Sequence, residues 1–389
     1  MTAEKSAVYL DNAATTPLDG RVLEAMLESL EGLRGNPSAL HAPGAAAREA
    51  VEEAREAVAA LVGASPEEIV FTSGGTEADN LAVLGLARAA PPGRRHAVIS
   101  RVEHPAVREA GRRLEAEGFE VTWLGVDGDG VVDAGAFEAA LREDTALAAV
   151  MWANNEVGSV QPVEELAAAC AERGIPFHAD AVQAAGRLPV DVRRVPVSTL
   201  ALSAHKLYGP QGAGALYVRE GVEVSPLILG GGQERGLRSG TENVAAISGF
   251  GVAARLAAGE LEERARRERE LRDRILAGVR EMEGVRLNGH PRRRLPNNVH
   301  LTVEGVEAEG LVLFLDALGY AVGSGAACSS GGHKASPVLL AMGLGEREAF
   351  SSVRITVGKD NTFEEVDGFL AAFRQAVGRL RELSPLQAG

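Results

Sequence analysis

Short apolar segments alternate with helical patterns along the first part of the chain. The apolar segments lie at 69–72, 97–100, 121–124, 147–152, 176–180, 199–202 and 215–218. Before the first of these segments, 44–62 shows helical periodicity, with Glu and Arg separating the apolar Ala47, Val51, Ala54, Val58 and Leu61. This alternation predicts an α/β fold in which a mainly parallel sheet carries helices on both faces.

The pattern changes near residue 260, where a charge-rich helix is predicted over 260–282. In this helix Glu precedes Arg by four positions in five pairs, Glu260/Arg264, Glu262/Arg266, Glu263/Arg267, Glu268/Arg272 and Glu270/Arg274. A helix of this kind can lie across the surface between two domains. Strand-like segments at 298–303 and 353–357 flank a Gly/Ser-rich stretch at 323–332, which indicates a smaller α+β domain after the break.

Composition and charge exclude several classes of protein. Hydrophobic residues make up 46% and charged residues 24% of the 389 residues, as in ordinary globular proteins. The chain has 40 basic and 54 acidic residues, a net charge of -14, so we expect no direct nucleic-acid binding. No apolar run approaches the roughly 18 residues of a membrane helix. With only two cysteines and no leader-like N-terminus, the chain is expected to be cytoplasmic, without a membrane contact.

Candidate reactive side chains come directly after, or at the end of, predicted strands. They are His104, Asn154, Asn155, Asp180 and Lys206. Ligands of open α/β sheets bind outside the carboxyl ends of the strands, so these side chains are expected to converge on one crevice.

Lys206 and Asp180 together indicate a particular cofactor. Lys206 is one of only four lysines, and an amine, unlike a guanidinium, can form a Schiff base. Asp180 ends an apolar segment, where a carboxylate needs a cation such as a protonated pyridinium nitrogen. Pyridoxal phosphate (PLP) requires both groups. The alternatives are a solvated loop lysine and an Asp that caps the next helix.

Two further segments have the chemistry that such a cofactor needs. The run Thr72-Ser73-Gly74-Gly75-Thr76-Glu77 leaves a strand and opens a helix, which can aim backbone N–H groups at a phosphate; the alternative is a capped turn. His104 can cover a cofactor ring or transfer protons, or it can be a satisfied loop histidine. The chain contains no HExxH or CxxC motif, so a protein-bound metal is not expected.

The two cysteines have opposite interpretations. Cys328 lies in a segment of Gly, Ser and Ala that is too small and polar to pack a core, which suits a mobile nucleophile or an incidental loop thiol. Cys170 lies on an apolar helix face and is expected in the core. Arg354 interrupts a β-branched strand, where it can bind a carboxylate or form an edge-strand salt bridge. Asn36 and His41 form a polar gate or a turn.

As a set, these motifs resemble the cysteine desulfurases of the NifS/IscS type, which are class V aminotransferase-like PLP enzymes. The matching segments run nearly from end to end: YLDNAATTP (9–17), TSGGTE (72–77), EH (103–104), NNE (154–156), HADAVQ (178–183), SAHK (203–206), RSGTEN (238–243) and the loop with Cys328. The resemblance implies a homodimer of the PLP-dependent transferase fold type I. It also implies a large PLP-binding domain over 15–260, and a small domain, made of 1–14 and 261–389, that carries a mobile Cys328 loop.

The resemblance implies a role for each site residue. Lys206 would hold PLP, Asp180 would pair with the ring nitrogen, and His104 would stack on the ring and move protons. Gln183 and Asn155 would address the ring hydroxyl and the substrate. The phosphate would be bound by Gly75, Thr76, Ser203 and His205, together with Thr241 of a second subunit. The substrate carboxylate would be bound by Arg354 and Asn36.

The reaction implied by the resemblance is the conversion of L-cysteine to L-alanine. Cys328 would attack the substrate sulfur and carry it as a persulfide to sulfur-acceptor proteins of iron-sulfur assembly, tRNA thiolation or thio-cofactor pathways. A class V aminotransferase or a selenocysteine lyase could share Lys206 and Asp180. A non-catalytic sulfur-relay or scaffold protein is a third interpretation, which the intact set of Lys206, Asp180 and His104 disfavours.

Overall fold

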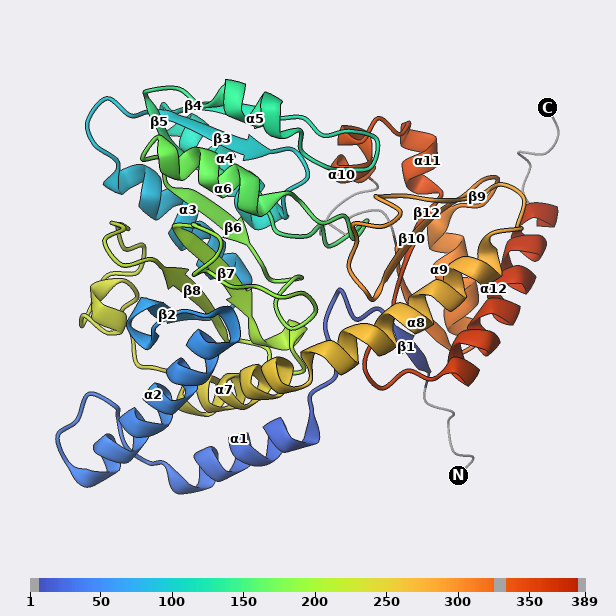
Figure 1. The fold of residues 1–389 in the computed structure, drawn as a ribbon. Helices are drawn as coiled ribbons and strands as arrows, with labels where there is room; N and C mark the ends of the chain where they lie inside the picture. Colours follow the sequence, from blue (N-terminus) through green and yellow to red (C-terminus); the bar gives the residue numbers. More distant parts are fainter. Residues whose placement is uncertain (1–6, 325–333, 384–389) are drawn as a thin grey trace.

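The computed structural model describes residues 7–324 and 334–383 and contains two sheets (Figure 1). The larger sheet has seven strands in the order β2-β8-β7-β6-β5-β3-β4. Their bounds are β2 Ile69–Thr72, β3 His96–Ser100, β4 Glu120–Leu124, β5 Thr145–Ala149, β6 Phe177–Asp180, β7 Thr199–Ser203 and β8 Gly214–Val218. β8 is antiparallel to β7 and β2, and the other neighbouring strands are parallel. The predicted mainly parallel sheet is confirmed.

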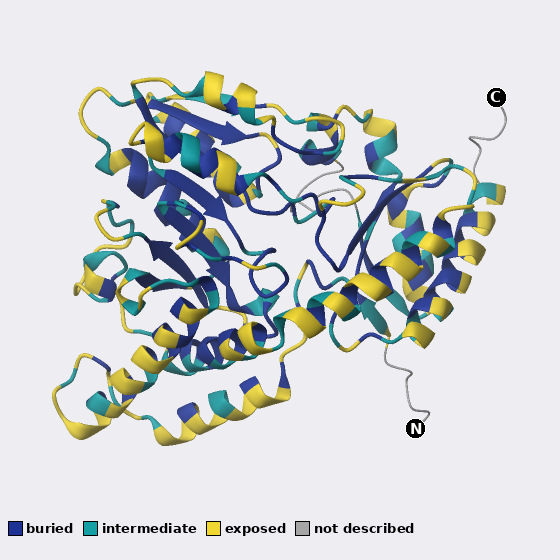
Figure 2. Ribbon diagram, in the orientation of Figure 1, coloured by how far each residue is buried: buried dark blue, intermediate teal, exposed yellow. Residues whose placement is uncertain are grey.

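Apolar side chains on both faces of this sheet are buried, because helices cover both faces (Figure 2). Leu200 and Leu202 of β7 belong to one core, whereas Ala201 between them belongs to the other. The first core includes α2 (Ala42–Val62), α6 (Val163–Glu172) and α7 (Val244–Gly259), and the second includes α3 (Gly75–Ala89) and α4 (Pro105–Ala116). Burial on both faces explains why these strands are continuous apolar runs rather than alternating patterns.

The smaller sheet has five strands in the order β1-β11-β12-β10-β9. β1 pairs in parallel with β11, and the other pairs are antiparallel. The strands are β1 Val8–Leu10, β9 Val285–Leu287, β10 Asn298–Val303, β11 Tyr320–Ser324 and β12 Ser352–Thr356. A separate core joins them to α9 (Ala308–Ala317) and α12 (Phe363–Leu383). The described chain also contains α1 Gly20–Gly32, α5 Ala134–Ala140, α10 Pro337–Ala341 and α11 Glu346–Phe350.

The charge-rich helix α8 (Leu261–Val279) follows α7 and runs from the larger sheet to the smaller one (Figure 1). Of the five Glu/Arg spacings in the sequence, Glu260 and Arg264 form an ion pair, and the other four make none within the described residues. Arg274 instead reaches Asp367 of α12 at 2.5 Å. Arg266 and Glu270 pair within the helix, whereas Arg267 and Arg274 find partners outside it, because the helix packs against neighbouring elements.

Two sequence-based expectations about burial and membranes can be compared with the structure. Cys170 of α6 is fully buried in the first core, as predicted, and burial raises its pKa to about 12. Within residues 7–324 and 334–383, no single helix is long and apolar enough to cross a membrane; only α7 and α8 taken together meet that criterion, and they meet at a 73° bend.

Candidate active site

A pocket of about 380 Å³ lies where several strands of the larger sheet end, beside the smaller sheet. Ten of the residues proposed from the sequence line this pocket, namely Gly75, Thr76, His104, Asn155, Asp180, Gln183, Ser203, His205, Lys206 and Arg354. Ala13, Ala14, Asp79 and Val182, which the sequence-based proposal did not include, also line it. The predicted convergence of side chains that follow strands therefore occurs in the folded chain.

Lys206 ends the short 3-10 turn Ala204–Lys206 that follows β7. Its Nζ donates to the backbone oxygens of Ala13 at 2.6 Å and Ala14 at 2.5 Å. Burial lowers the pKa of Lys206 to about 7, and the neighbouring guanidinium groups of Arg354 and Arg187 act in the same direction. A substantial fraction of this amine is therefore unprotonated near neutral pH, which is the form that attacks a carbonyl carbon.

Asp180 is the last residue of β6 and is 5% exposed. Its Oδ1 accepts a hydrogen bond from the backbone N–H of Val182 at 2.9 Å. Burial raises the pKa of Asp180, whereas His104 and Lys206 stabilise its charged form. The residues after Asp180 form turns rather than a helix, so the alternative role as a helix cap does not apply. A cationic group in the pocket would compensate the buried carboxylate.

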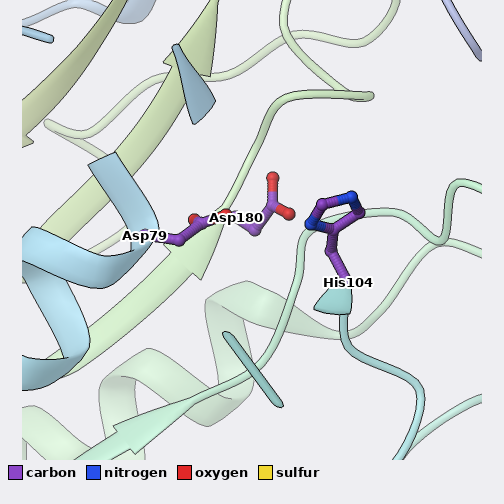
Figure 3. A group of neighbouring side chains, drawn as sticks. All are labelled: Asp79, His104 and Asp180. Atoms are coloured by element: carbon purple, nitrogen blue, oxygen red, sulfur yellow. The ribbon is translucent and has the colours of Figure 1, made fainter. Parts of the chain in front are cut away.

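His104 precedes α4, and its Nδ1 accepts a hydrogen bond from the backbone N–H of Ala106 at 3.2 Å. Burial lowers its pKa, which favours the neutral ring with a protonated Nε2. Figure 3 shows the Asp180 carboxylate directed at the His104 ring, with Asp79 beside them. Ligand atoms of these three residues lie within 4.8 Å of one another, a spacing that also suits a metal ion. The expectation that no metal binds stays a prediction.

Asp79 is a buried carboxyl group that sequence interpretation missed. Asp79 lies one helical turn after Gly75 on α3. Positions i and i+4 share one face of a helix, so this spacing could have placed Asp79 on the same side as the glycine turn. Its Oδ1 lies 3.1 Å from Nε2 of His178. Burial raises the pKa of Asp79 well above its usual value, and the nearby carboxyls of Asp180 and Glu103 raise it further. The charged form of Asp180, unlike that of Asp79, is stabilised by His104 and Lys206.

The start of α3 forms one end of the pocket. Gly74 has a φ of 155°, a backbone conformation that favours glycine. A Cβ on Gly75 would lie 2.8 Å from the Val182 side chain, so a larger residue there would require Val182 to move. The first N–H groups of α3 have no partner within the helix and, with the helix dipole, favour an anion. Ser203 and His205 line the same pocket. These donors fit a phosphate group.

Gln183 has an incomplete hydrogen-bond set. Its Nε2 donates to the backbone oxygen of Ala13 at 2.9 Å, and its buried Oε1 has no partner among the described residues. An orphaned buried acceptor of this kind is costly unless a ligand supplies a donor. The hydroxyl group of a bound aromatic ring is such a donor, so Gln183 fits the role that the resemblance implies.

Arg354 extends from β12 into the pocket. Its Nη1 donates to the backbone oxygen of Asn155 at 3.0 Å, and its Nη2 donates to Asp11 Oδ1 at 2.8 Å. The alternative of an edge-strand salt bridge is correct in that Arg354 forms a salt bridge with Asp11. It is wrong about the strand, because β12 lies in the middle of its sheet. A guanidinium in a pocket can bind a substrate carboxylate.

Two of the proposed residues that the structure describes do not line this pocket. Asn36 is exposed, and its Oδ1 accepts a hydrogen bond from the backbone of Ser38 at 2.9 Å. Thr241 is also exposed, in the loop before α7. Cys328 lies outside the described residues. His41 caps α2 by accepting from the N–H of Gly44 at 3.2 Å, which fits the turn alternative.

Residues 11–16, which we call the N-terminal strap, cross from the smaller sheet to the larger one at the pocket. Besides holding Lys206 and Gln183 through Ala13 and Ala14, the strap contacts His205, whose Nδ1 lies 3.0 Å from Thr15 Oγ1. Burial lowers the pKa of His205 to about 4, so its ring is neutral. No local sequence signal marks these backbone oxygens, because their availability depends on tertiary structure.

Comparison with known proteins assigns the fold and pocket to a family. The model of the class-V aminotransferases matches residues 8–369. This chain belongs to the class-V aminotransferase family. Enzymes of that family use PLP, so membership supports the cofactor that Lys206 and Asp180 indicate.

Full-length relatives of this class-V aminotransferase place it with the cysteine desulfurases. It is 48% identical over 385 residues to "Cysteine desulfurase IscS" of Neisseria meningitidis, a match that covers 98% of this chain and 95% of the relative. Identity to "Cysteine desulfurase IscS" of Methanosarcina thermophila is 44%, covering 99% and 96%. A solved "NifS-like protein" superposes with a TM-score of 0.90 at 38% identity, covering 96% and 100%. The resemblance to NifS/IscS-type enzymes and the fold type I architecture are confirmed.

Proposed function

We propose that this protein is a PLP-dependent cysteine desulfurase that converts L-cysteine to L-alanine. The observation that carries the proposal is the convergence of Lys206, Asp180, His104 and Arg354 on one pocket, in a chain whose full-length relatives are named cysteine desulfurases. PLP, when bound, supplies an electron sink that stabilises negative charge at the substrate carbons.

The residues of the pocket fit the parts of that cofactor. Lys206 would hold it covalently, and its pKa of about 7 would let the free amine accept or donate a proton near neutral pH. Asp180 would pair with the ring nitrogen, and neutral His104 would stack on the ring and move protons. The phosphate would be held by Gly75 and Thr76 at the start of α3 and by Ser203 and His205 at and after the end of β7. Gln183 would offer the ring hydroxyl its amide oxygen, which has no partner among the described residues.

The substrate and its sulfur are handled by other residues. Arg354 binds the carboxylate of L-cysteine, with Asn155 beside it and Asn36 as a further proposed contact. The thiolate of Cys328 attacks the substrate sulfur, so that an S–S bond forms and the C–S bond breaks. The electron pair of that bond stays on the substrate carbon, which takes up a proton to give L-alanine. Cys328 is left as a persulfide, and sulfur-acceptor proteins of iron-sulfur assembly or thiolation pathways collect the sulfur.

A homodimer would complete the site. Thr241 and Asn36 are exposed in a single chain and lie outside the pocket, although the proposed roles place both at the ligands. The large domain also exposes apolar side chains, with Leu40 97% and Leu229 78% exposed. We therefore propose that these loops pack against a second copy, whose Thr241 reaches the phosphate.

We also propose the organisation and setting of the enzyme. The large domain spans 15–260, and the small domain combines 1–14 with 261–389; the pairing of β1 with β11 supports placing the N-terminus in the small domain. The enzyme is expected to act in the cytoplasm, without direct contact with a membrane or nucleic acid.

The test is a paired assay on purified wild type and Cys328→Ala. A visible absorption band from PLP and the release of alanine and sulfide from L-cysteine with a thiol reductant are expected for wild type, with sulfide lost in the variant. Cys170→Ala is the matched control, because that thiol is buried in the core and should leave sulfide release intact. A PLP band without sulfide from wild type would instead favour an aminotransferase or a lyase for another substrate, and no band at all would contradict the enzyme assignment.

A further inference from the structure

Asp11 forms an ion pair beside the pocket that the proposed function does not use. Its Oδ1 accepts from Arg354 Nη2 at 2.8 Å, while Arg354 Nη1 is held by the backbone oxygen of Asn155 at 3.0 Å. The Arg354 Nε is buried and has no partner within the described part of the chain. The guanidinium is therefore oriented by two contacts and keeps N–H groups for a ligand.

The position of Asp11 is fixed by its surroundings. The Tyr9 hydroxyl donates to the Asp11 backbone oxygen at 3.0 Å, and the Asn12 side chain donates to the backbone oxygen of Thr356 at 2.9 Å. A Cβ on Gly323 would lie 2.7 Å from Asp11 Oδ1, so the glycine leaves the space that the carboxylate occupies. Asp11 is built into the site as firmly as Arg354.

The charges around Lys206 leave Asp11 with a distinct role. The neighbours that act on this amine are the cations Arg354 and Arg187 and the carboxylates Asp11 and Asp180. If Asp180 faces the cofactor ring, Asp11 is the carboxylate in direct contact with Arg354 where an incoming amino acid binds. Glu156, whose hydroxyl partner is Ser336, acts on Arg354 without such a contact in the described chain. Because Asp11 Oδ1 lies 2.8 Å from Arg354 Nη2, a carboxylate bound to Arg354 lies next to this anion, and a second carboxylate on the same amino acid is repelled by it.

We propose that Asp11 is a positioning residue that also determines specificity. It orients Arg354 toward one α-carboxylate, and its own charge disfavours amino acids that carry a second carboxylate. The inference rests on the proposed function in one respect, since it takes Arg354 as the group that binds the substrate carboxylate.

The experiment compares the binding of L-alanine and L-aspartate to the PLP-loaded enzyme, followed by the absorbance of the cofactor. Neither ligand contains sulfur, and both have the same α-carboxylate, so the ratio of their dissociation constants isolates the effect of the second carboxylate. Asp11→Asn keeps an oxygen that accepts from Arg354 but removes the charge. We expect it to reduce the ratio of the L-aspartate to the L-alanine constant at least fivefold. Asp316→Asn, at an exposed position on α9, is the control and should leave the ratio unchanged.

An unchanged ratio in Asp11→Asn would overturn the proposal. A second measurement needs no variant: raising the salt from about 0.1 M to 1 M shortens the Debye length from about 10 Å to 3 Å. The wild-type ratio should therefore fall, and a ratio independent of salt would also overturn the proposal. Sulfide release from L-cysteine by wild type tests the proposed function separately. Binding of both ligands without sulfide release would refute the desulfurase while the Asp11 comparison still stands on its own result.

Discussion

The buried amine of Lys206 predicts how the stability of the cofactor-free protein changes with pH. In the folded chain burial, reinforced by Arg354 and Arg187, lowers its pKa from 10.5 to about 7. An unfolded chain exposes this lysine and restores the ordinary pKa. Between the two values the unfolded state binds a proton that the folded state lacks, so the free energy of unfolding must rise with pH. The slope from this one group is at most about 1.4 kcal/mol per pH unit.

Comparison of wild type with Lys206→Met isolates this slope. The free energy of unfolding is measured in urea at about pH 7.5, 8.5 and 9.5, and subtraction of the variant from wild type cancels the groups that both proteins share. Two pH units would give at most about 2.7 kcal/mol. Because the amine is partly reached by solvent, we expect the difference to increase by roughly 2 kcal/mol over this range.

Lys334→Met provides the control, because Lys334 is exposed. The difference between wild type and this variant should be the same at all three pH values. If the Lys206→Met difference were equally flat, the folded-state pKa of Lys206 would have to lie near its unfolded value. The argument that burial supplies a neutral amine at physiological pH would then be wrong.

Two other substitutions test separate parts of the structure. Gly323→Ala places a Cβ 2.7 Å from Asp11 Oδ1, so the KM for L-cysteine should rise roughly tenfold, a loss of about 1.4 kcal/mol of binding, with an unchanged circular dichroism spectrum. The control is Gly310→Ala on α9, whose Cβ would meet only an ordinary contact and should leave KM unchanged. An unchanged KM in Gly323→Ala would contradict the reasoning. Glu234→Ala removes both carboxylate oxygens that Arg55 contacts at 2.8 Å in a buried bidentate pair. Urea unfolding should show that the free energy of unfolding falls by about 3–5 kcal/mol. A decrease below about 1 kcal/mol, the value of an exposed ion pair, would show that the pair is hydrated in solution.

The strands of the larger sheet were predictable from the sequence because their apolar runs are local signals. The run at 147–152 was the least accurate, since β5 ends at Ala149 and residues 150–152 are buried beyond the end of the strand. β1 was not predicted at all. It has three residues and exists because it pairs with β11, more than 300 residues later in the chain, which no local pattern reports.

Most of the site was predictable because chemistry and position coincide at the ends of strands. Lys206, Asp180 and His104 are rare or costly residue types at such positions, and the glycine turn before α3 has a distinct sequence. Asp79 was missed because a carboxylate in the first turns of a helix is ordinary on the surface, and only the packing of α3 buries it. The roles of Asn36 and Thr241 came from the resemblance to the NifS/IscS-type enzymes and not from the chemistry of these residues. Neither residue lines the pocket of a single chain.

The N-terminal strap has a consequence for the order in which this enzyme folds. Its contacts join residues 344 positions apart, from Asn12 to Thr356, and 193 positions apart, from Lys206 to Ala13. The ribosome releases the strap long before its partners on β12, which follow 344 positions later. Long-range contacts of this kind form late, because the entropy of closing the intervening loop must be overcome. During synthesis the larger sheet can therefore form while the strap is still unpaired, and the finished pocket is a property of the completed chain.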